Sequence, residues 1–323
     1  MRSERQNPPA SIMRSDALYQ IAVGMWYERT GAELPFSDIH VALDAREPKP
    51  DRPNLTFAVD TTRSPFAVAS GEADLSFFNP SEFLTMAYRG VGPFPEPLPL
   101  RTIAVFPSWD RMGFAVSSRT GLESLAAIRD RRYPLRISVR ALDTDTTRFV
   151  VDEVLATLGF SLEDVESWGG SLHRAGTPGD RSRLSGIEDG SIDAVFDEGI
   201  NAWAHTALSH GMRLLPIDAE AGRHMQDLGW RVGPIPTSWD KALDRDVPAI
   251  DFSGWPLYTR ADLPEEIAYR VCKSLDASRS RIPFDSPEPV ELADLCNDSD
   301  ATPLDVPLHA GAERYYREQG ALR

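Results

Sequence analysis

Two acidic residues stand side by side at the end of a hydrophobic run in the second half of the chain. Asp197 and Glu198 follow the apolar stretch 192–196, and Asn201 lies three residues further on. Neighbouring carboxylates can bind a cationic or hydroxylated group, or act as general acid and base where a pocket raises the pKa of one of them. A solvated turn, or one paired with an arginine, explains the same residues, and both interpretations stay open.

Two arginines stand at comparable positions. Arg140 ends a hydrophobic run, and Arg63 follows Thr62 at the end of another. A guanidinium group in such a place can hold a ligand carboxylate through two parallel hydrogen bonds. The alternative for Arg140 is an ion pair with Asp143 or Asp145. The two arginines therefore compete as candidate anchors for an anion.

Hydroxyl and amide side chains lie in the same kinds of loop. Thr144, Thr146 and Thr147 precede a helical pattern, so they are candidate helix caps as well as candidate ligand contacts. Asn79 and Ser81 flank a proline, a normal way to stop a strand and start a helix. We also expect ligand contacts from this second turn.

Aromatic residues gather near the predicted strand ends. They are Trp26, Tyr27, Trp109, Trp168 and Trp203. Such side chains can stack on a planar ligand, and Trp26, Tyr27 and Trp109 are included among the candidate binding residues. Packing in the core is the alternative for each of them.

Composition and motifs exclude several classes of protein. The net charge of −15 argues against a nucleic-acid partner, although a small acidic ligand needs only one or two arginines. The histidines and cysteines form no zinc motif, and no phosphate loop or dinucleotide fingerprint is present, so we expect no metal and no cofactor. Cys272 and Cys296 are best interpreted as structural thiols. His205 is the histidine that an enzyme would use together with Asp197 and Glu198.

The hydrophobic pattern alternates between strands and helices. Short apolar runs predict strands at 19–24, 55–60, 74–78, 100–106, 113–118, 135–140, 192–196 and 212–217. Helical patterns lie at 63–71, 81–90, 148–160 and 181–190. This alternation indicates an α/β fold with parallel sheets, and 323 residues favour two lobes.

One phrase occurs twice. "GEADLSFFNP" at 71–80 and "GSIDAVFDEG" at 190–199 both run from glycine through aspartate into a hydrophobic stretch with a polar end. Two unrelated helix–turn–strand units would produce this pattern. Equivalent strands in twin lobes, each ending at a shared cleft, would produce it too, and we favour that interpretation because ligand loops of α/β sheets follow the strand ends.

Three long stretches of the chain resemble the TAXI family of solute receptors of TRAP transporters. They are "SGEADLSFFNPSEFLTMAYRGVGPF", "LRTIAVFPSWDRMGFAVSSRTGLESLAAIRDRR" and, at 307–320, "PLHAGAERYYREQG". The resemblance implies a type II periplasmic binding protein fold, in which each lobe is a mainly parallel sheet flanked by helices, with a hinge and a central cleft. It places lobe I at 1–115, with 250–323 returning to it, and lobe II at 116–249.

The same resemblance implies which loops face the ligand. They are 24–27, 60–63, 79–81, 140–147 and 197–201. In the family the second-lobe loop is rich in glycine, whereas "RALDTDTTRF" contains none, so side chains must replace backbone groups there. The implied function is a non-catalytic solute-binding protein that closes its two lobes on an organic carboxylate, and the aromatic residues favour an aromatic one.

Location and partners follow from the N-terminal residues and the resemblance. The N-terminal sequence lacks the apolar core of a secretion signal and no stretch is long enough to span a membrane, so we expect a cytoplasmic protein. A periplasmic protein whose leader was removed, with TRAP membrane subunits as partners, is the alternative. The second functional hypothesis is a cytoplasmic enzyme on the same fold, such as a decarboxylase acting on an aromatic carboxylate.

Overall fold

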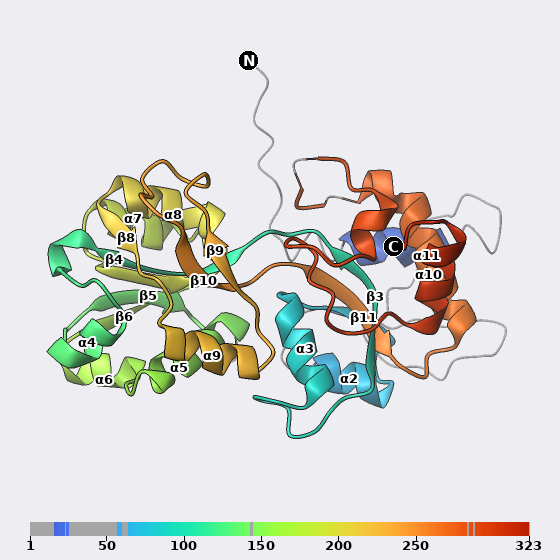
Figure 1. The fold of residues 1–323 in the computed structure, drawn as a ribbon, viewed down its shortest axis with the longest axis horizontal. Coiled ribbons are helices and arrows are strands. Elements are labelled where there is room, and N and C mark those ends of the chain that lie inside the picture. The colour runs from blue at the N-terminus through green and yellow to red at the C-terminus, as the bar shows by residue number, and fades with distance from the viewer. Residues whose placement is uncertain are drawn as a thin grey trace, which may run out of the picture. The chain divides into compact units, whose positions relative to one another are not determined.

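The chain forms two compact units in a computed structural model. The structure describes residues 16–22, 24–25, 57–59, 64–142, 145–282, 284–286 and 288–322. The first unit comprises Met1–Trp109 and Ser253–Arg323, and the second comprises Asp110–Phe252. Each combines a β-sheet with helices (Figure 1), which confirms the predicted α/β fold class.

The first unit contains a four-stranded sheet in the order β1-β2-β11-β3. Its strands are β1 (Phe57–Val59), β2 (Leu75–Phe77), β3 (Leu100–Phe106) and β11 (Trp255–Arg260). Its labelled helices are α2 (Ser64–Ser70), α3 (Ser81–Arg89), α10 (Glu265–Ser278) and α11 (Ala310–Glu318). Short 3₁₀ turns follow at Arg279–Arg281 and Leu292–Leu295.

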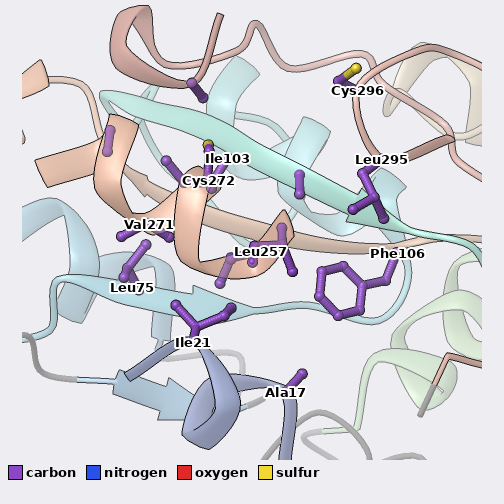
Figure 2. Packing of buried hydrophobic residues seen from close by; sticks show 14 of the residues in the cluster. Ala17, Ile21, Leu75, Ile103, Phe106, Leu257, Val271, Cys272, Leu295 and Cys296 are labelled. Atoms are coloured by element: carbon purple, nitrogen blue, oxygen red, sulfur yellow. The ribbon is translucent and has the colours of Figure 1, made fainter. Parts of the chain in front are cut away.

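A hydrophobic core joins segments of the first unit that are far apart in the sequence. Figure 2 shows Ile21, Leu75 and Val271 around the same core, from the N-terminal helical segment, β2 and α10. All three side chains are fully buried. Burial of such side chains contributes about 1.5–3 kcal/mol each, so the N-terminal segment is an integral part of this core.

The predicted strand at 19–24 is wrong. Residues 16–22 and 24–25 are helical, and the side chains of Ala17, Ile21 and Met25 are buried at intervals of four residues. That spacing marks one face of a helix. A short apolar run can form either a strand or a buried helix, so the sequence pattern alone does not decide between them. Here the segment packs closely on α10 as a helix. A Cβ added at Gly24 would lie only 3.1 Å from Cβ of Ser274.

The second unit contains a seven-stranded sheet in the order β6-β5-β7-β4-β10-β9, with β8 paired to β4. Its strands are β4 (Arg111–Ser117), β5 (Arg136–Arg140), β6 (Ser171–Ala175), β7 (Ala194–Asp197), β8 (Met212–Leu214), β9 (Val232–Ile235) and β10 (Val247–Asp251). Its helices are α4 (Ala126–Arg131), α5 (Thr146–Thr157), α6 (Leu162–Ser167), α7 (Arg181–Glu188), α8 (Ile200–Ser209) and α9 (Ala219–Asp227). A 3₁₀ turn at Ser118–Thr120 follows β4.

Both sheets are mixed. Pairing is parallel between β1 and β2, and between β5 and each of β6 and β7. The strands next to the two crossings between units, β3, β4, β10 and β11, pair in antiparallel fashion with their neighbours. A chain that leaves a unit and later returns to it supplies strands of opposite direction, which the parallel pattern of the helix–strand repeats does not predict.

Among the described residues, no helix combines the length and apolar character needed to cross a membrane.

The repeated sequence forms one helix–turn–strand unit in the first compact unit and another in the second. α2 leads through Gly71 into β2, and α7 leads through Gly190 into β7. The two glycines have φ of 79° and 74°, a left-handed conformation that glycine adopts without strain. Each strand then pairs in parallel with an earlier strand of its own sheet. The repetition therefore has a structural basis in two equivalent helix–turn–strand units.

Candidate functional site

Arg140, Asp197 and Glu198 lie together at neighbouring strand ends of the second unit. Arg140 ends β5 and Asp197 ends β7, and these strands are parallel neighbours, so their carboxyl ends share one edge of the sheet. Nε of Arg140 donates to Oδ1 of Asp197 over 2.8 Å, and its Nη2 donates to Oε1 of Glu198. Of the predicted alternative partners of Arg140, Asp143 lies outside the described residues, and the side chain of Asp145 caps α5.

A second arginine lies behind the first. Arg183 on α7 is fully buried, and its Nη1 donates to the other carboxylate oxygen of Asp197. Its Nε donates to Oγ of Ser138 over 2.8 Å, and Ser138 lies 2.9 Å from Nδ1 of His173. Nη2 of Arg183 is a buried donor with no hydrogen-bond partner among the described residues. Asp197 is thus a carboxylate held between two guanidinium groups.

Asp110 occupies the N-terminus of α8. Its side chain is 8% exposed, and its carboxylate accepts hydrogen bonds from the backbone N–H groups of Arg111 at 2.8 Å, Gly199 at 2.6 Å and Ile200 at 3.2 Å. Burial raises the pKa of Asp110 to about 7, although these three hydrogen bonds oppose the shift and the charge of Asp197 adds to it. The helix terminus that could bind a ligand anion is therefore filled by the protein's own carboxyl group.

The electrostatic surroundings of Arg140 are acidic. Burial alone would lower the pKa of Arg140, but the charges of Asp197, Asp145 and Asp110 raise it. Burial raises the pKa of the Asp197 carboxyl, and the guanidinium groups of Arg183 and Arg140 oppose that shift. The two guanidinium groups are thus matched by at least as many carboxylates.

The threonine-rich loop is placed by Asp145. The side chain of Asp145 accepts a hydrogen bond of 2.9 Å from the backbone N–H of Thr147 and so caps α5, a role that we predicted for the threonines. Thr146 and Thr147 are 9% and 2% exposed in the first turn of α5. Thr144 lies outside the described residues. The hydroxyl groups of Thr146 and Thr147 remain predicted ligand contacts.

Asn201 and His205 lie on α8 and contact the loop between β9 and β10. Oδ1 of Asn201 accepts from Nε1 of Trp239 over 2.9 Å, while the ring of His205 stacks on Trp239 with centroids 4.1 Å apart. Nδ1 of His205 lies 2.5 Å from Oδ2 of Asp240. Within the described part of the chain, no hydrogen bond or ion pair joins His205 to Asp197 or Glu198. The predicted catalytic group of these three residues is not assembled.

The aromatic residues noted near the predicted strand ends are buried, partly buried or outside the described residues. Trp203 is 1% exposed and donates from Nε1 to the backbone oxygen of Glu198 over 2.9 Å, and Trp168 stacks on Phe160. Trp109 is partly buried at the end of the first unit's first segment. The predicted contacts that lie outside the described residues are Trp26, Tyr27, Thr62 and Arg63.

In the first unit, the predicted turn follows β2. Asn79 is half-buried, and Ser81 begins α3 with a side chain that is 5% exposed. Oγ of Ser81 has no hydrogen-bond partner among the described residues. Glu82, in the first turn of the same helix, is fully buried, a position where a negative charge interacts favourably with the helix dipole. This turn remains a predicted contact region of the first unit.

Asp110 and Arg183 belong to this cluster although no local signal in the sequence marks them. Asp110 begins the segment that leads into β4, and Arg183 lies in a helix that reads as polar. Only the antiparallel pairing of β4 with β7, in which Gly113 lies opposite Asp197, brings Asp110 to the site. The described residues contain no cluster of metal ligands. Cys272 and Cys296 are free and buried, and burial raises the pKa of Cys272 to about 12, as expected of structural thiols.

Comparison with known proteins places the chain in a family. Residues 60–320 match the model of the NMT1-like family, so the chain belongs to that family. Among solved structures it is similar to MatC from Rhodopseudomonas palustris with bound malate, at 10% identity and a TM-score of 0.42, over 98% of this chain and 93% of that one. It is also similar to a structure described as a periplasmic transporter, at 10% identity and a TM-score of 0.41, over 98% and 91%.

A third similar structure is a putative sulfonate ABC transporter protein, the periplasmic sulfonate-binding protein SsuA from Methylobacillus flagellatus KT. The identity is 11% and the TM-score 0.38, over 80% of this chain and 70% of that one. The predicted cytoplasmic location is contradicted by these comparisons, because the location named in their descriptions is the periplasm. That prediction rested on the hydropathy of N-terminal residues alone, and residues 1–15 lie outside the described part of the chain.

Proposed function

We propose that the protein is a solute-binding protein of the TAXI type that binds an organic carboxylate, with Arg140 as the anchor in the second unit. One observation carries the proposal: Arg140 stands at the end of β5 with its Nε fixed by the buried Asp197. Within the part of the chain that the structure describes, its Nη1 makes one long hydrogen bond of 3.3 Å, to the backbone oxygen of Gly176. A guanidinium group that is already oriented, and has a weakly bonded nitrogen, can bind a ligand carboxylate at little cost in side-chain entropy.

The surrounding residues support this role. Thr146, Thr147 and the first turn of α5 follow the same strand end, and Glu198 and Asn201 follow the neighbouring one. Hydroxyl, amide and carboxylate groups beside an arginine can orient a polar solute. The enzyme hypothesis lacks a comparable observation, since Asp197 is held by two arginines and His205 contacts Asp240 instead.

Ligand binding tests the proposal. We expect carboxylates from a panel of aliphatic and aromatic acids to raise the melting temperature of the protein. Calorimetry should then show that Arg140→Ala reduces the free energy of ligand binding by about 2–5 kcal/mol. Arg223→Ala, at an exposed position on α9, is the matched control and should leave the Kd unchanged. Equal affinity of the wild type and Arg140→Ala for every carboxylate would contradict the proposed anchor.

Transport is the finer part of the proposal. In the TAXI family a receptor delivers its solute to TRAP membrane subunits after closing two lobes on it. For this chain we therefore expect a ligand-dependent decrease in the radius of gyration, measured by small-angle scattering, that Arg140→Ala abolishes. An unchanged ligand after incubation distinguishes a receptor from a decarboxylase, which would release CO₂.

A further inference from the structure

A ligand carboxylate that binds Arg140 through both Nη1 and Nη2, as paired carboxylates commonly do, competes with Glu198 for Nη2. The side chains of Arg140 and Glu198 are 12% and 9% exposed, so their ion pair is largely removed from water. A ligand carboxylate that takes up the Nη2 donor of Arg140 must separate this pair. In a poorly solvated place the separation is costly, because charge–charge interactions are weakly screened there.

The backbone of Glu198 is anchored while its carboxylate has a single kind of partner. The Glu198 N–H donates to Oδ1 of Asp197 over 2.9 Å, and its backbone oxygen accepts from Trp203. Among the described residues, the hydrogen-bond partner of the Glu198 carboxylate is Arg140. Asp197, by contrast, is held on both carboxylate oxygens. The group that can yield to a ligand is therefore Glu198.

The charges of the cluster decide what can replace this pair. Arg140 and Arg183 carry two positive charges, and Asp197 and Glu198 carry two negative ones. Asp145 adds negative charge around Arg140, and Asp110 adds more where it is ionised. A ligand that brings only a carboxylate would add a negative charge to a site that has no surplus of positive charge, and would leave Glu198 without its partner.

From this arrangement we propose that Glu198 makes the site selective for carboxylates that carry a hydrogen-bond donor, hydroxyl or ammonium, on the neighbouring carbon. The inference rests on the proposed function, since it assumes that Arg140 holds the ligand carboxylate. The donor of such a ligand bonds to Glu198 while its carboxylate bonds to Arg140, so neither buried group loses its partner. A plain carboxylate offers nothing to Glu198.

Two matched series of probes test the selectivity. Succinate, malate and aspartate share a four-carbon skeleton and carry hydrogen, hydroxyl or ammonium at one carbon; 3-phenylpropionate, phenyllactate and phenylalanine form the aromatic counterpart. In the wild type we expect the donor-bearing members of the series that binds to have a Kd about tenfold lower than the plain member, because the latter leaves a buried carboxylate unpaired. A preference for the ammonium over the hydroxyl member would identify charge, rather than hydrogen bonding alone, as its source.

Variants of Glu198 provide the decisive comparison. Glu198→Gln removes the charge and Glu198→Ala removes the acceptor, and in both we expect the plain carboxylate to bind more tightly and the preference for donors to shrink. Glu166→Gln, at an exposed position on α6, should leave the preference as it is. Circular dichroism and the melting temperature establish that each variant is folded.

The outcomes separate the inference from the function on which it rests. If Arg140→Ala abolishes binding but the Glu198 variants keep the wild-type preference, the carboxylate site stands and the role of Glu198 is refuted. Equal binding of succinate, malate and aspartate by the wild type, or of the aromatic three, refutes it as well. If no probe binds to the wild type or to either Glu198 variant, the proposed carboxylate site fails and the inference falls with it.

Discussion

Nε of Arg140 lies 2.8 Å from Oδ1 of Asp197, and the side chain of Asp197 is completely buried. The second oxygen of this carboxylate accepts from Arg183, which is buried to the same extent. Asp197 therefore pairs with two guanidinium groups at the end of β7, while among the described residues the adjacent Glu198 pairs with Arg140. The two acidic residues are adjacent in the sequence, but in the fold Asp197 is held on both carboxylate oxygens, while Glu198 is the one that we propose as a ligand contact.

The first prediction follows from this difference. Asp197→Ala should lower the free energy of unfolding by about 3–5 kcal/mol, because it leaves the buried guanidinium group of Arg183 without a carboxylate partner. Glu198→Gln removes a charge but keeps a hydrogen-bond acceptor near Arg140, whose Nε stays paired with Asp197, and should cost about 1–2 kcal/mol, less than Asp197→Ala. Urea unfolding followed by circular dichroism measures both. Equal losses for the two variants would show that Asp197 has no special structural role.

Asp110 should make stability depend on pH. Its pKa is raised by burial from 3.8 to about 7, so the folded protein holds a proton that the unfolded chain releases above about pH 4. The raised pKa therefore adds to the free energy of unfolding in full below about pH 4. This contribution, on the order of 4 kcal/mol, is lost as the pH rises from about 4 to 7. Asp110→Asn cannot ionise and should flatten this part of the profile.

Melting temperatures between pH 4.5 and 8 measure this effect as the difference between the wild type and Asp110→Asn. Because Asp197 is buried in both proteins, this difference reports the titration of Asp110 together with its charge interaction with Asp197. Asp227→Asn, at an exposed position of α9, is the control and should follow the wild-type profile. An Asp110→Asn profile parallel to that of the wild type would mean that Asp110 titrates near its ordinary pKa.

The sequence predicts strand ends better than it predicts their neighbours. Arg140 and Asp197 are recognisable as ends of apolar runs because short buried strands are hydrophobic throughout and stop at polar residues. Nothing local shows that β5 and β7 are adjacent in the sheet, or that the start of the antiparallel β4 lies beside the end of β7. Asp110 and Arg183 reach the site through these non-local pairings, which is why the sequence alone did not identify them.

Helix capping is another place where local signals were ambiguous. The stretch from Asp143 to Thr147 offers five residues that can cap a helix, and the structure selects Asp145. Asp145→Ala should destabilise the second unit by about 1 kcal/mol. Asp145→Asn retains a capping oxygen and should restore most of that loss, while removing one negative charge from the surroundings of Arg140. Thermal unfolding distinguishes these variants, and a deficit that Asn does not relieve would indicate that charge, not capping, is what stabilises this turn.

The last prediction concerns the packing of α8 on β4, which determines where Glu198 and the α8 terminus stand. A Cβ at Gly113 of β4 would lie 2.9 Å from Cζ2 of Trp203 and 3.0 Å from Cγ2 of Ile200, and both side chains are buried. Gly113→Ala should therefore cost about 1–3 kcal/mol, because a close-packed interface cannot admit a methyl group without moving the helix. Gly222 on α9 is the matched control: its added Cβ would meet nothing closer than Val232 at 3.9 Å. Gly222→Ala should stabilise the protein by up to about 1 kcal/mol through helix propensity. Opposite signs in urea unfolding are the expected result, and a Gly113→Ala protein as stable as the wild type would show that α8 can shift on β4 without cost.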